Sequence, residues 1–353
     1  MKKFIYDFNH IKSGNKDEIF LYGAGAMGKE AYKKIKNKSA STQIKFIDDY
    51  VDEIFGQKTV TWNSLSDEQK KNTILTNRFL SEQTELSEVP IYVGDLPKGQ
   101  ATAKNKIDFL AVGKIIEKLS DNLSSRIYSA VIKLRIIDAK EFAFQELHDI
   151  LKSNPYGKQY TEYLPDKLGY VIDAGFYDGY SSAQIVGDRS YQKIYGFDPA
   201  EKILHICCRG LRITKVKAAL FSRSGSGQFL FDESAPTESK LSKLDNFFEA
   251  QKLTAVEMIS LDDYFSAGIP SNSVIKTDLE GADYDAILGG QNIILKSRPW
   301  IAVSIYHSTE DLTRIPLYLM SYLIDYSFYV RHYSFSFNET ILYCVPNEGA
   351  RDK

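Results

Sequence analysis

Short apolar runs followed by glycine turns recur in two separate parts of the chain. In the first part, the pattern predicts strands at 19–22, 44–47 and 73–76, a glycine turn at 23–28 and a helix at 29–36. A buried strand, a turn, a helix and a second strand in this order form a βαβ unit with parallel strands. We therefore expect a small Rossmann-like α/β domain near the N-terminus.

The second series begins at Tyr170 and predicts a larger sheet. Its expected elements are strands at 170–173, 193–197, 215–220, 274–278 and 300–305, a glycine turn at 174–179, a helix at 180–185, and a turn at 224–227 before a hairpin arm at 228–231. The segments 327–331 and 340–345 alternate around a short polar connection, which is typical of an antiparallel pair. We expect this pair to close an otherwise mostly parallel sheet.

The segment between the two series has helical spacing of its apolar residues. Residues 103–165 predict two or three helices, with a turn at 154–157. The fold class is therefore α/β, with a helical connector between the two sheets. The predicted division is an N-terminal domain at 1–102, the connector at 103–168 and the larger domain at 169–353.

Composition narrows the class of protein. The 353 residues are too many for one ordinary core, and 43% hydrophobic with 25% charged residues is typical of a soluble globular protein. A net charge of −2 with scattered Lys and Arg argues against a nucleic-acid groove or a basic membrane patch. No apolar run is long enough for a transmembrane helix. The three cysteines, Cys207, Cys208 and Cys344, predict neither a disulfide framework nor a zinc site, which favours a cytoplasmic setting.

The first glycine turn has the spacing of a nucleotide-binding loop. Gly23, Gly25 and Gly28 fit G-x-G-x-x-G, and Asp48 follows about 20 positions later. The stretch resembles the N-terminal domain of sugar-modifying enzymes such as sialic-acid-type acetyltransferases, which implies a nucleotide-sugar site at these four residues. NAD, a nucleotide sugar or no ligand at all are each compatible with the pattern. A short-chain dehydrogenase would need a Tyr-x-x-x-Lys pair on a later helix. The pair Tyr32/Lys36 has this spacing but falls in the first helix, so a dehydrogenase is disfavoured.

The second glycine turn differs in its charge. Asp173 ends the strand before Gly175 and Gly179, and a carboxylate there suits a cationic ligand such as S-adenosylmethionine better than a pyrophosphate. Asp198 ends the next strand, where it is placed to accept both ribose hydroxyls. The antiparallel closing pair is a third feature, after Asp173 and Asp198, that favours S-adenosylmethionine over a dinucleotide, because dinucleotide folds usually lack such a pair.

At this point the residues carry a family resemblance. Tyr170 to about Pro346 resembles the FkbM-type methyltransferase domain, through VIDAGFYDG, IYGFDPAEK, SLDDYF, IKTDLEGADYDAILGG, RPWIAVSIYH and YVRHYSFSFNETILY. The resemblance implies a class I, S-adenosylmethionine-dependent O-methyltransferase, commonly acting on saccharides or secondary-metabolite hydroxyls. The expected cofactor-binding residues are Asp173, Gly175, Tyr177, Gly179, Asp198 and Asp278. The chain departs from many members at Asp198, which is often Glu, and at 176–178, where a smaller pair is common.

Methyl transfer to oxygen needs alignment and a proton acceptor. His307 follows a strand end, and its ordinary pKa makes it the expected general base. His332, near Glu339, is the alternative base. Asp278 and Glu280 are expected to orient the acceptor or the donor amine. They could also bind a metal with His307, although we predict no metal, and Lys276 could pair with either.

His205, Cys207 and Cys208 lie on a predicted helix, where packing is their expected role. The function that the sequence favours is methyl transfer to a hydroxyl of a saccharide, a glycoconjugate or a related metabolite, as in polysaccharide biosynthesis. The N-terminal domain would help to hold this acceptor, which can be nucleotide-linked. The alternatives are a nucleotide-sugar or NAD-dependent oxidoreductase or epimerase that uses the first glycine turn, and a non-catalytic nucleotide-binding protein. The acceptor and the oligomeric state stay open.

Overall fold

The computed structural model describes most of the chain in two compact units. The described residues are 4–5, 8, 18–49, 51–76, 86, 89–92, 107–136, 140–153, 159–200, 204–231, 240–241, 252–334 and 337–347. One unit takes residues 1–103, 133–152 and 334–337, and the other takes 104–132, 153–333 and 338–353. The expected domain limit at residue 102 and the expected turn at 154–157 lie outside the described residues, and the three-part division stays a prediction.

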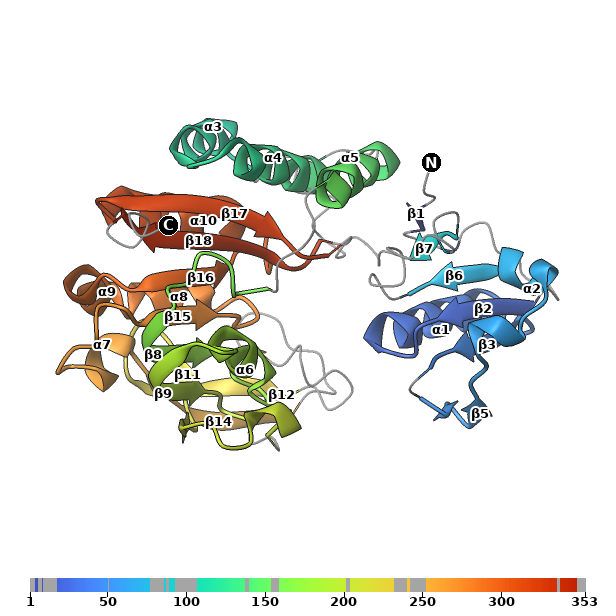
Figure 1. The fold of residues 1–353 in the computed structure, drawn as a ribbon, viewed down its shortest axis with the longest axis horizontal. Helices are drawn as coiled ribbons and strands as arrows, with labels where there is room; N and C mark the ends of the chain where they lie inside the picture. Colours follow the sequence, from blue (N-terminus) through green and yellow to red (C-terminus); the bar gives the residue numbers. More distant parts are fainter. Residues whose placement is uncertain are drawn as a thin grey trace. The chain divides into compact units, whose positions relative to one another are not determined.

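The first unit is built on a five-stranded sheet in which every neighbouring pair is parallel. The strands, in sheet order, are β1 (Phe4–Ile5), β7 (Ile91–Tyr92), β6 (Thr73–Leu75), β2 (Glu18–Tyr22) and β3 (Gln43–Ile47). Helix α1 (Ala26–Lys38) connects β2 to β3 (Figure 1). It buries Ala31 and Ile35 in the apolar core of the unit. The predicted strands lie where the periodicity placed them, whereas the helix begins at Ala26, so the turn expected at 23–28 is wrong for residues 26–28.

The remaining elements of the first unit are short, apart from one helix. They are β4 (Glu53–Ile54), β5 (Gln57–Lys58), a 3-10 turn (Trp62–Ser64), α2 (Asp67–Lys71) and α5 (Lys140–Ser153). Ser66 starts α2 with a capping box, since its hydroxyl accepts from the Gln69 amide and the Gln69 side chain accepts from the Ser66 amide.

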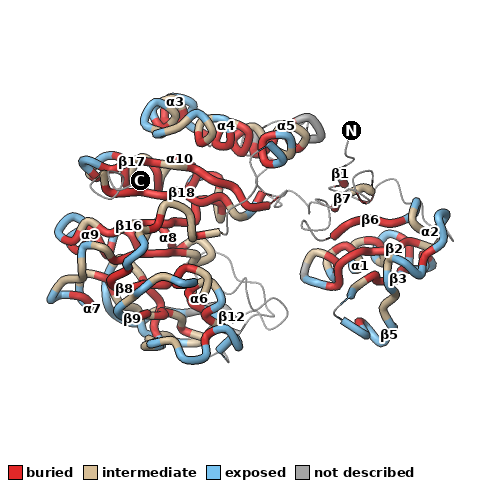
Figure 2. Tube along the Cα trace, viewed as in Figure 1, coloured by how far each residue is buried: buried red, intermediate tan, exposed pale blue. Residues whose placement is uncertain are grey.

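The second unit carries the larger sheet, of seven strands. In sheet order these are β10 (Ile213–Val216), β9 (Ser190–Phe197), β8 (Lys167–Ala174), β15 (Val274–Thr277), β16 (Trp300–Ser304), β18 (Thr340–Pro346) and β17 (Tyr326–His332). The first five run parallel, and β18 and β17 are antiparallel to their neighbours. The predicted closing pair is therefore confirmed. Figure 2 shows that the middle strands are buried.

Helices cover this sheet. They are α3 (Phe109–Lys118), α4 (Asn122–Ile136), α6 (Tyr180–Val186), α7 (Leu261–Tyr264), α8 (Asp283–Leu288), α9 (Gln291–Ser297) and α10 (Asp311–Tyr322). Two side chains connect α3 and α4 to α10. Lys118 donates to the Met320 carbonyl at 2.7 Å, and Tyr128 donates to the Leu312 carbonyl at 2.9 Å. No helix in the described ranges is both long and apolar enough to cross a membrane.

A small second sheet corrects two expectations. Its strands are β11 (Ala219–Leu220), β14 (Lys252–Ile259), β12 (Gly225–Phe231) and β13 (Lys240–Leu241). The single strand expected at 215–220 is in fact split between the two sheets. The turn expected at 224–227 is wrong for residues 225–227, which pair with β14. Glycine and serine favour turns locally, and here pairing with a distant strand overrides that preference.

Candidate functional site

The glycine loop between β8 and α6 is fixed against the end of β15. Gly175 has a φ of 78° and Gly179 a φ of 83°, both in the left-handed region that favours glycine. A Cβ on Gly175 would lie 2.0 Å from the carbonyl oxygen of Asp278, and one on Gly179 would lie 2.6 Å from the Phe176 ring. The two glycines are therefore required by the close contact of loop, ring and strand.

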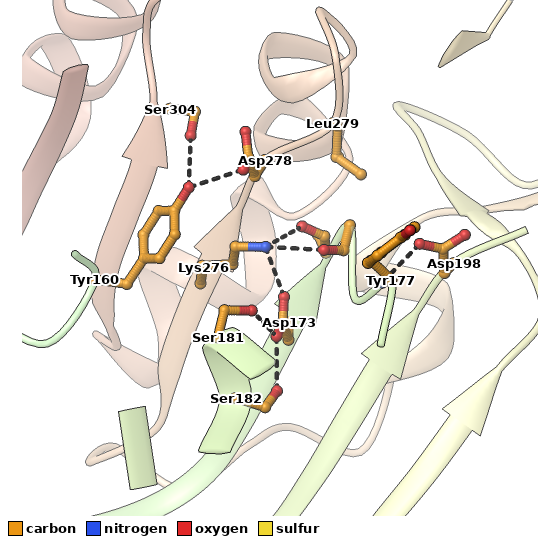
Figure 3. Close-up of polar contacts among 12 residues, drawn as sticks. Tyr160, Asp173, Tyr177, Ser181, Ser182, Asp198, Lys276, Asp278, Leu279 and Ser304 are labelled. Carbon is orange, nitrogen blue, oxygen red and sulfur yellow. Dashed lines mark hydrogen bonds and ion pairs between the residues drawn. The ribbon is translucent and has the colours of Figure 1, made fainter. Parts of the chain in front are cut away.

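Asp173, near the end of β8, fixes this loop through a buried ion pair with Lys276 of β15. Its Oδ1 lies 2.8 Å from Lys276 Nζ, and its Oδ2 accepts hydrogen bonds from Ser181 at 2.8 Å and Ser182 at 2.6 Å (Figure 3). Lys276 also donates to the Gly175 carbonyl at 2.9 Å. Both ends of the pair are fully buried. These contacts are internal and position the loop. The expected role of Asp173 toward a cationic ligand stays a prediction.

Lys276 keeps its charge in this position. Burial lowers the pKa of its ammonium group, but the carboxylates of Asp173 and Asp278 raise it by more, so that the net pKa is above the ordinary value. The sequence left Lys276 to pair with Asp278 or Glu280. The structure pairs it with Asp173 instead.

Asp198 lies at the end of β9, beside the loop, as the ribose prediction required. It accepts a hydrogen bond from the Tyr177 amide on Oδ2 at 2.8 Å (Figure 3). Its Oδ1 accepts one from the Ala200 amide, also at 2.8 Å. Burial raises the pKa of Asp198. A carboxylate offers about four acceptor positions, so two amide donors leave capacity for hydroxyl groups. The exposed Tyr177 has a φ of 49°, in the left-handed region.

Asp278 ends β15 and is held on both oxygens. Tyr160 donates to Oδ2 at 2.9 Å and Tyr306 donates to Oδ1 at 3.0 Å. Burial raises the pKa of Asp278, but His307 and the charge of Lys276 lower it more, and the net pKa is well below the ordinary value. Asp278 is therefore a carboxylate with a fixed orientation at neutral pH.

His307 forms a pair with a carboxylate that the sequence reasoning did not single out. Its Nδ1 lies 2.9 Å from Oδ2 of the fully buried Asp283, which also accepts from the Leu279 amide at 3.2 Å. Its Nε2 lies 3.3 Å from Asp278 Oδ1 and 3.7 Å from Glu280 Oε2, so the ring faces carboxylates on both sides. The predicted residues His307, Asp278 and Glu280 thus lie together.

The charges around His307 decide its protonation. Burial lowers the pKa of the imidazole, and the carboxylates of Asp283 and Asp278 raise it well above the ordinary value. The ring is therefore a cation at neutral pH in this structure. Asp283 orients it so that Nε2 faces Asp278 and Glu280, which is the arrangement that fixes a histidine for proton transfer.

Several of these contacts come from residues that the sequence analysis did not identify as site residues. Asp283 lies inside the stretch IKTDLEGADYDAILGG, six residues from Thr277, so its acidic side chain in that stretch was a usable signal. Tyr160 and Tyr306 gave none, because a tyrosine that binds a distant carboxylate looks like any other packing residue.

Other candidates lie elsewhere. His332 is buried between β17 and β18, with Nδ1 2.8 Å from the Thr340 hydroxyl. Cys208 is buried and donates to the Gly179 carbonyl at 3.2 Å, from a 3-10 turn rather than the expected helix. In the part of the chain that the structure describes, no group of three or more acidic, histidine or cysteine side chains is arranged to hold a metal ion.

The first glycine turn has a related arrangement in its own unit. A Cβ on Gly28 would lie 2.0 Å from the Gly23 carbonyl, whereas one on Gly25 would meet open space. Asp48 accepts from the Ala24 amide at 2.8 Å, as Asp198 does from Tyr177. A nucleotide-sugar site at these residues stays a prediction.

Comparison with known proteins bears on the fold and on the class of the larger domain. Residues 173–336 match the family model of the methyltransferase FkbM domain. The crystal structure of methyltransferase FkbM from Methylobacillus flagellatus KT aligns over 94% of this chain and 90% of that chain, with a TM-score of 0.50 and 15% identity. No curated protein matches. The chain thus has the predicted α/β fold with a large, mostly parallel sheet, and its residues 173–336 match an FkbM methyltransferase domain.

Proposed function

We propose that this protein is an S-adenosylmethionine-dependent O-methyltransferase whose acceptor is a hydroxyl of a saccharide, a glycoconjugate or a related metabolite. The match of residues 173–336 to a methyltransferase domain supports transfer of a methyl group. One observation carries the proposal. The glycine loop and the His307 pair meet at the carboxyl ends of neighbouring strands, where Gly175 lies against the Asp278 carbonyl.

The residues of the loop fit the proposed donor. Asp198 keeps acceptor capacity for ribose hydroxyls, and Asp278 keeps capacity for an amino group or for the acceptor hydroxyl, because its two tyrosine donors occupy about half of its acceptor positions. The buried Nε2 of His307 lies beside Asp278 and Glu280, where a hydroxyl bound against these carboxylates would reach it. When bound, S-adenosylmethionine supplies a methyl group activated by its sulfonium charge.

The chain's own contribution is alignment and proton removal. Alignment of two reactants contributes up to ~7–11 kcal/mol, and a positioned base adds roughly 10²–10⁴-fold. His307 must be neutral to act as the base. Asp283 and Asp278 raise the pKa of its imidazole, and the sulfonium cation of a bound donor beside the ring would lower it. Nε2 then takes the hydroxyl proton while Nδ1 stays bonded to Asp283.

An acceptor screen tests the proposal. The protein is incubated with methyl-deuterated S-adenosylmethionine and a panel of neutral saccharides, amino sugars and nucleotide sugars, and products are read by mass spectrometry. We expect a product heavier by one labelled methyl group that is stable to mild base, as an ether is and an ester is not. Labelling of nitrogen or carboxyl groups alone would contradict an O-methyltransferase that acts on hydroxyls.

A further inference from the structure

A short segment before β8 has an uncommon backbone. Tyr160 and Tyr163 have φ values of 65° and 60°, in the left-handed region that bulky residues rarely adopt. Such conformations cost on the order of 1–3 kcal/mol each and persist only where surrounding contacts enforce them. The segment precedes residue 173, so it lies outside the part of the chain that matches the methyltransferase domain.

The closing strands hold this segment in place. The Tyr343 hydroxyl of β18 accepts from the Tyr160 amide at 2.9 Å. The Tyr163 ring stacks on Tyr329 of β17, with ring centroids 4.1 Å apart and planes 8° from parallel. Arg331 of β17 contacts the Tyr163 hydroxyl and lies 3.3 Å from Glu162. These contacts fix the backbone on which Tyr160 is carried.

Tyr160 points from this segment into the candidate site. Its ring lies over the Lys276 ammonium, 5.2 Å from centroid to Nζ. Its hydroxyl lies 2.9 Å from Asp278 Oδ2 and 3.3 Å from the Ser304 hydroxyl (Figure 3). A tyrosine has one proton to donate, and a carboxylate only accepts. The chain of donors therefore runs from Ser304 to Tyr160 to Asp278.

We propose that Tyr160 is a positioning residue that sets the orientation of the Asp278 carboxylate for the methyl donor. The inference rests on the proposed function and extends it to a residue outside the matched domain. Because Tyr160 occupies Oδ2 and Tyr306 occupies Oδ1, the carboxylate cannot rotate without breaking a charge-assisted hydrogen bond. Its remaining acceptor positions then have a fixed direction before any ligand arrives.

A double-mutant cycle on donor affinity tests this role. Calorimetry gives the S-adenosylmethionine Kd of the wild type, Tyr160→Phe, Asp278→Ala and the double variant. We expect Tyr160→Phe to weaken binding about tenfold, the effect of one hydrogen bond to a charged group. When Asp278 is already Ala, the same substitution should change Kd less than about twofold, because the residue through which it acts is gone.

The control is Tyr128→Phe, which removes a buried hydroxyl that donates to the Leu312 carbonyl rather than to Asp278. It should leave Kd unchanged, with the thermal midpoint of every variant recorded to detect misfolding. Equal effects of Tyr160→Phe with and without Asp278 would overturn the inference while leaving the methyltransferase proposal intact. A wild type with no affinity for S-adenosylmethionine would instead overturn that proposal, and this inference with it.

Discussion

Lys276 Nζ and Asp173 Oδ1 lie 2.8 Å apart, and both side chains are fully buried between β15 and β8. The pair explains how a loop with two left-handed glycines is held in one conformation. Lys276 also binds the carbonyls of Ala174 and Gly175, so one ammonium group joins two neighbouring strands to the loop between them. The candidate donor site is thus built on an internal salt bridge.

Removing one partner of this ion pair should lower the unfolding free energy more than replacing both partners. Lys276→Met leaves the Asp173 carboxylate buried without its partner, which typically costs about 3–5 kcal/mol of unfolding free energy. The double variant Lys276→Met/Asp173→Asn should recover part of that loss, because no uncompensated charge remains. Urea unfolding of the three variants measures this. Equal stability of wild type and Lys276→Met would contradict the role given to the pair.

Gly175 should tolerate no side chain. Gly175→Ala places a Cβ 2.0 Å from the Asp278 carbonyl at a φ of 78°, so we expect at least a tenfold loss of donor affinity. Gly210→Ala is the matched control, because Gly210 has a φ of 82° but nothing within 4 Å of its Cβ. That variant should lose about 1 kcal/mol of stability and keep its affinity. Similar affinities of the two variants would show that the loop does not contact the donor.

His307 should be needed for turnover and not for donor binding. His307→Ala removes the base but none of the contacts that Asp198 or the glycine loop makes, so Kd for S-adenosylmethionine should stay within about threefold. Turnover should fall by roughly 10²–10⁴-fold. Calorimetry and a product assay on the same preparation measure the two quantities. A variant that keeps its turnover would remove His307 from the mechanism.

The pH dependence of activity follows from the carboxylates around His307. The base must be neutral, and the imidazole pKa is raised well above its ordinary value of 6.5. We therefore expect kcat/KM to rise with pH and to reach its plateau only above this raised pKa. Asp283→Asn removes the largest charge that raises this pKa, and its profile should shift to lower pH. A shift to higher pH, or none, would contradict the pairing.

The same pKa bears on stability with the opposite sign. A histidine whose pKa is higher in the folded state than in the unfolded state stabilises the fold fully below pH 6.5, and that contribution disappears as pH rises through the folded value. The stability difference between wild type and His307→Gln should therefore be larger at pH 6 than at pH 9. Urea unfolding at the two pH values tests this.

Local patterns predicted the main sheet well and the contacts across it poorly. Residues 170–173, 193–197 and 300–305 are apolar runs whose strand character is visible within each run. In the strand β12, residues 228–231 were predicted as a hairpin arm, but residues 225–227 pair with the distant β14, and their glycine and serine residues favoured a turn instead.

In the candidate site, too, contacts between distant segments could not be predicted from local patterns. The position of Asp173 at a strand end was predictable, but its partner Lys276 is 103 residues away. Parallel pairing of β8 with β15 brings the two together, and neither segment alone indicates that the carboxylate is used internally. Tyr160 reaches Asp278 across 118 residues because β18 and β17 hold its segment in place.

The central claim is that the loop at Asp173–Gly179 binds S-adenosylmethionine. Isothermal titration of the purified protein with S-adenosylmethionine, S-adenosylhomocysteine and NAD tests it most directly. The account predicts heat and saturation with both sulfur ligands, and loss of that binding in Gly175→Ala. Saturable binding of NAD with no response to either sulfur ligand would contradict it.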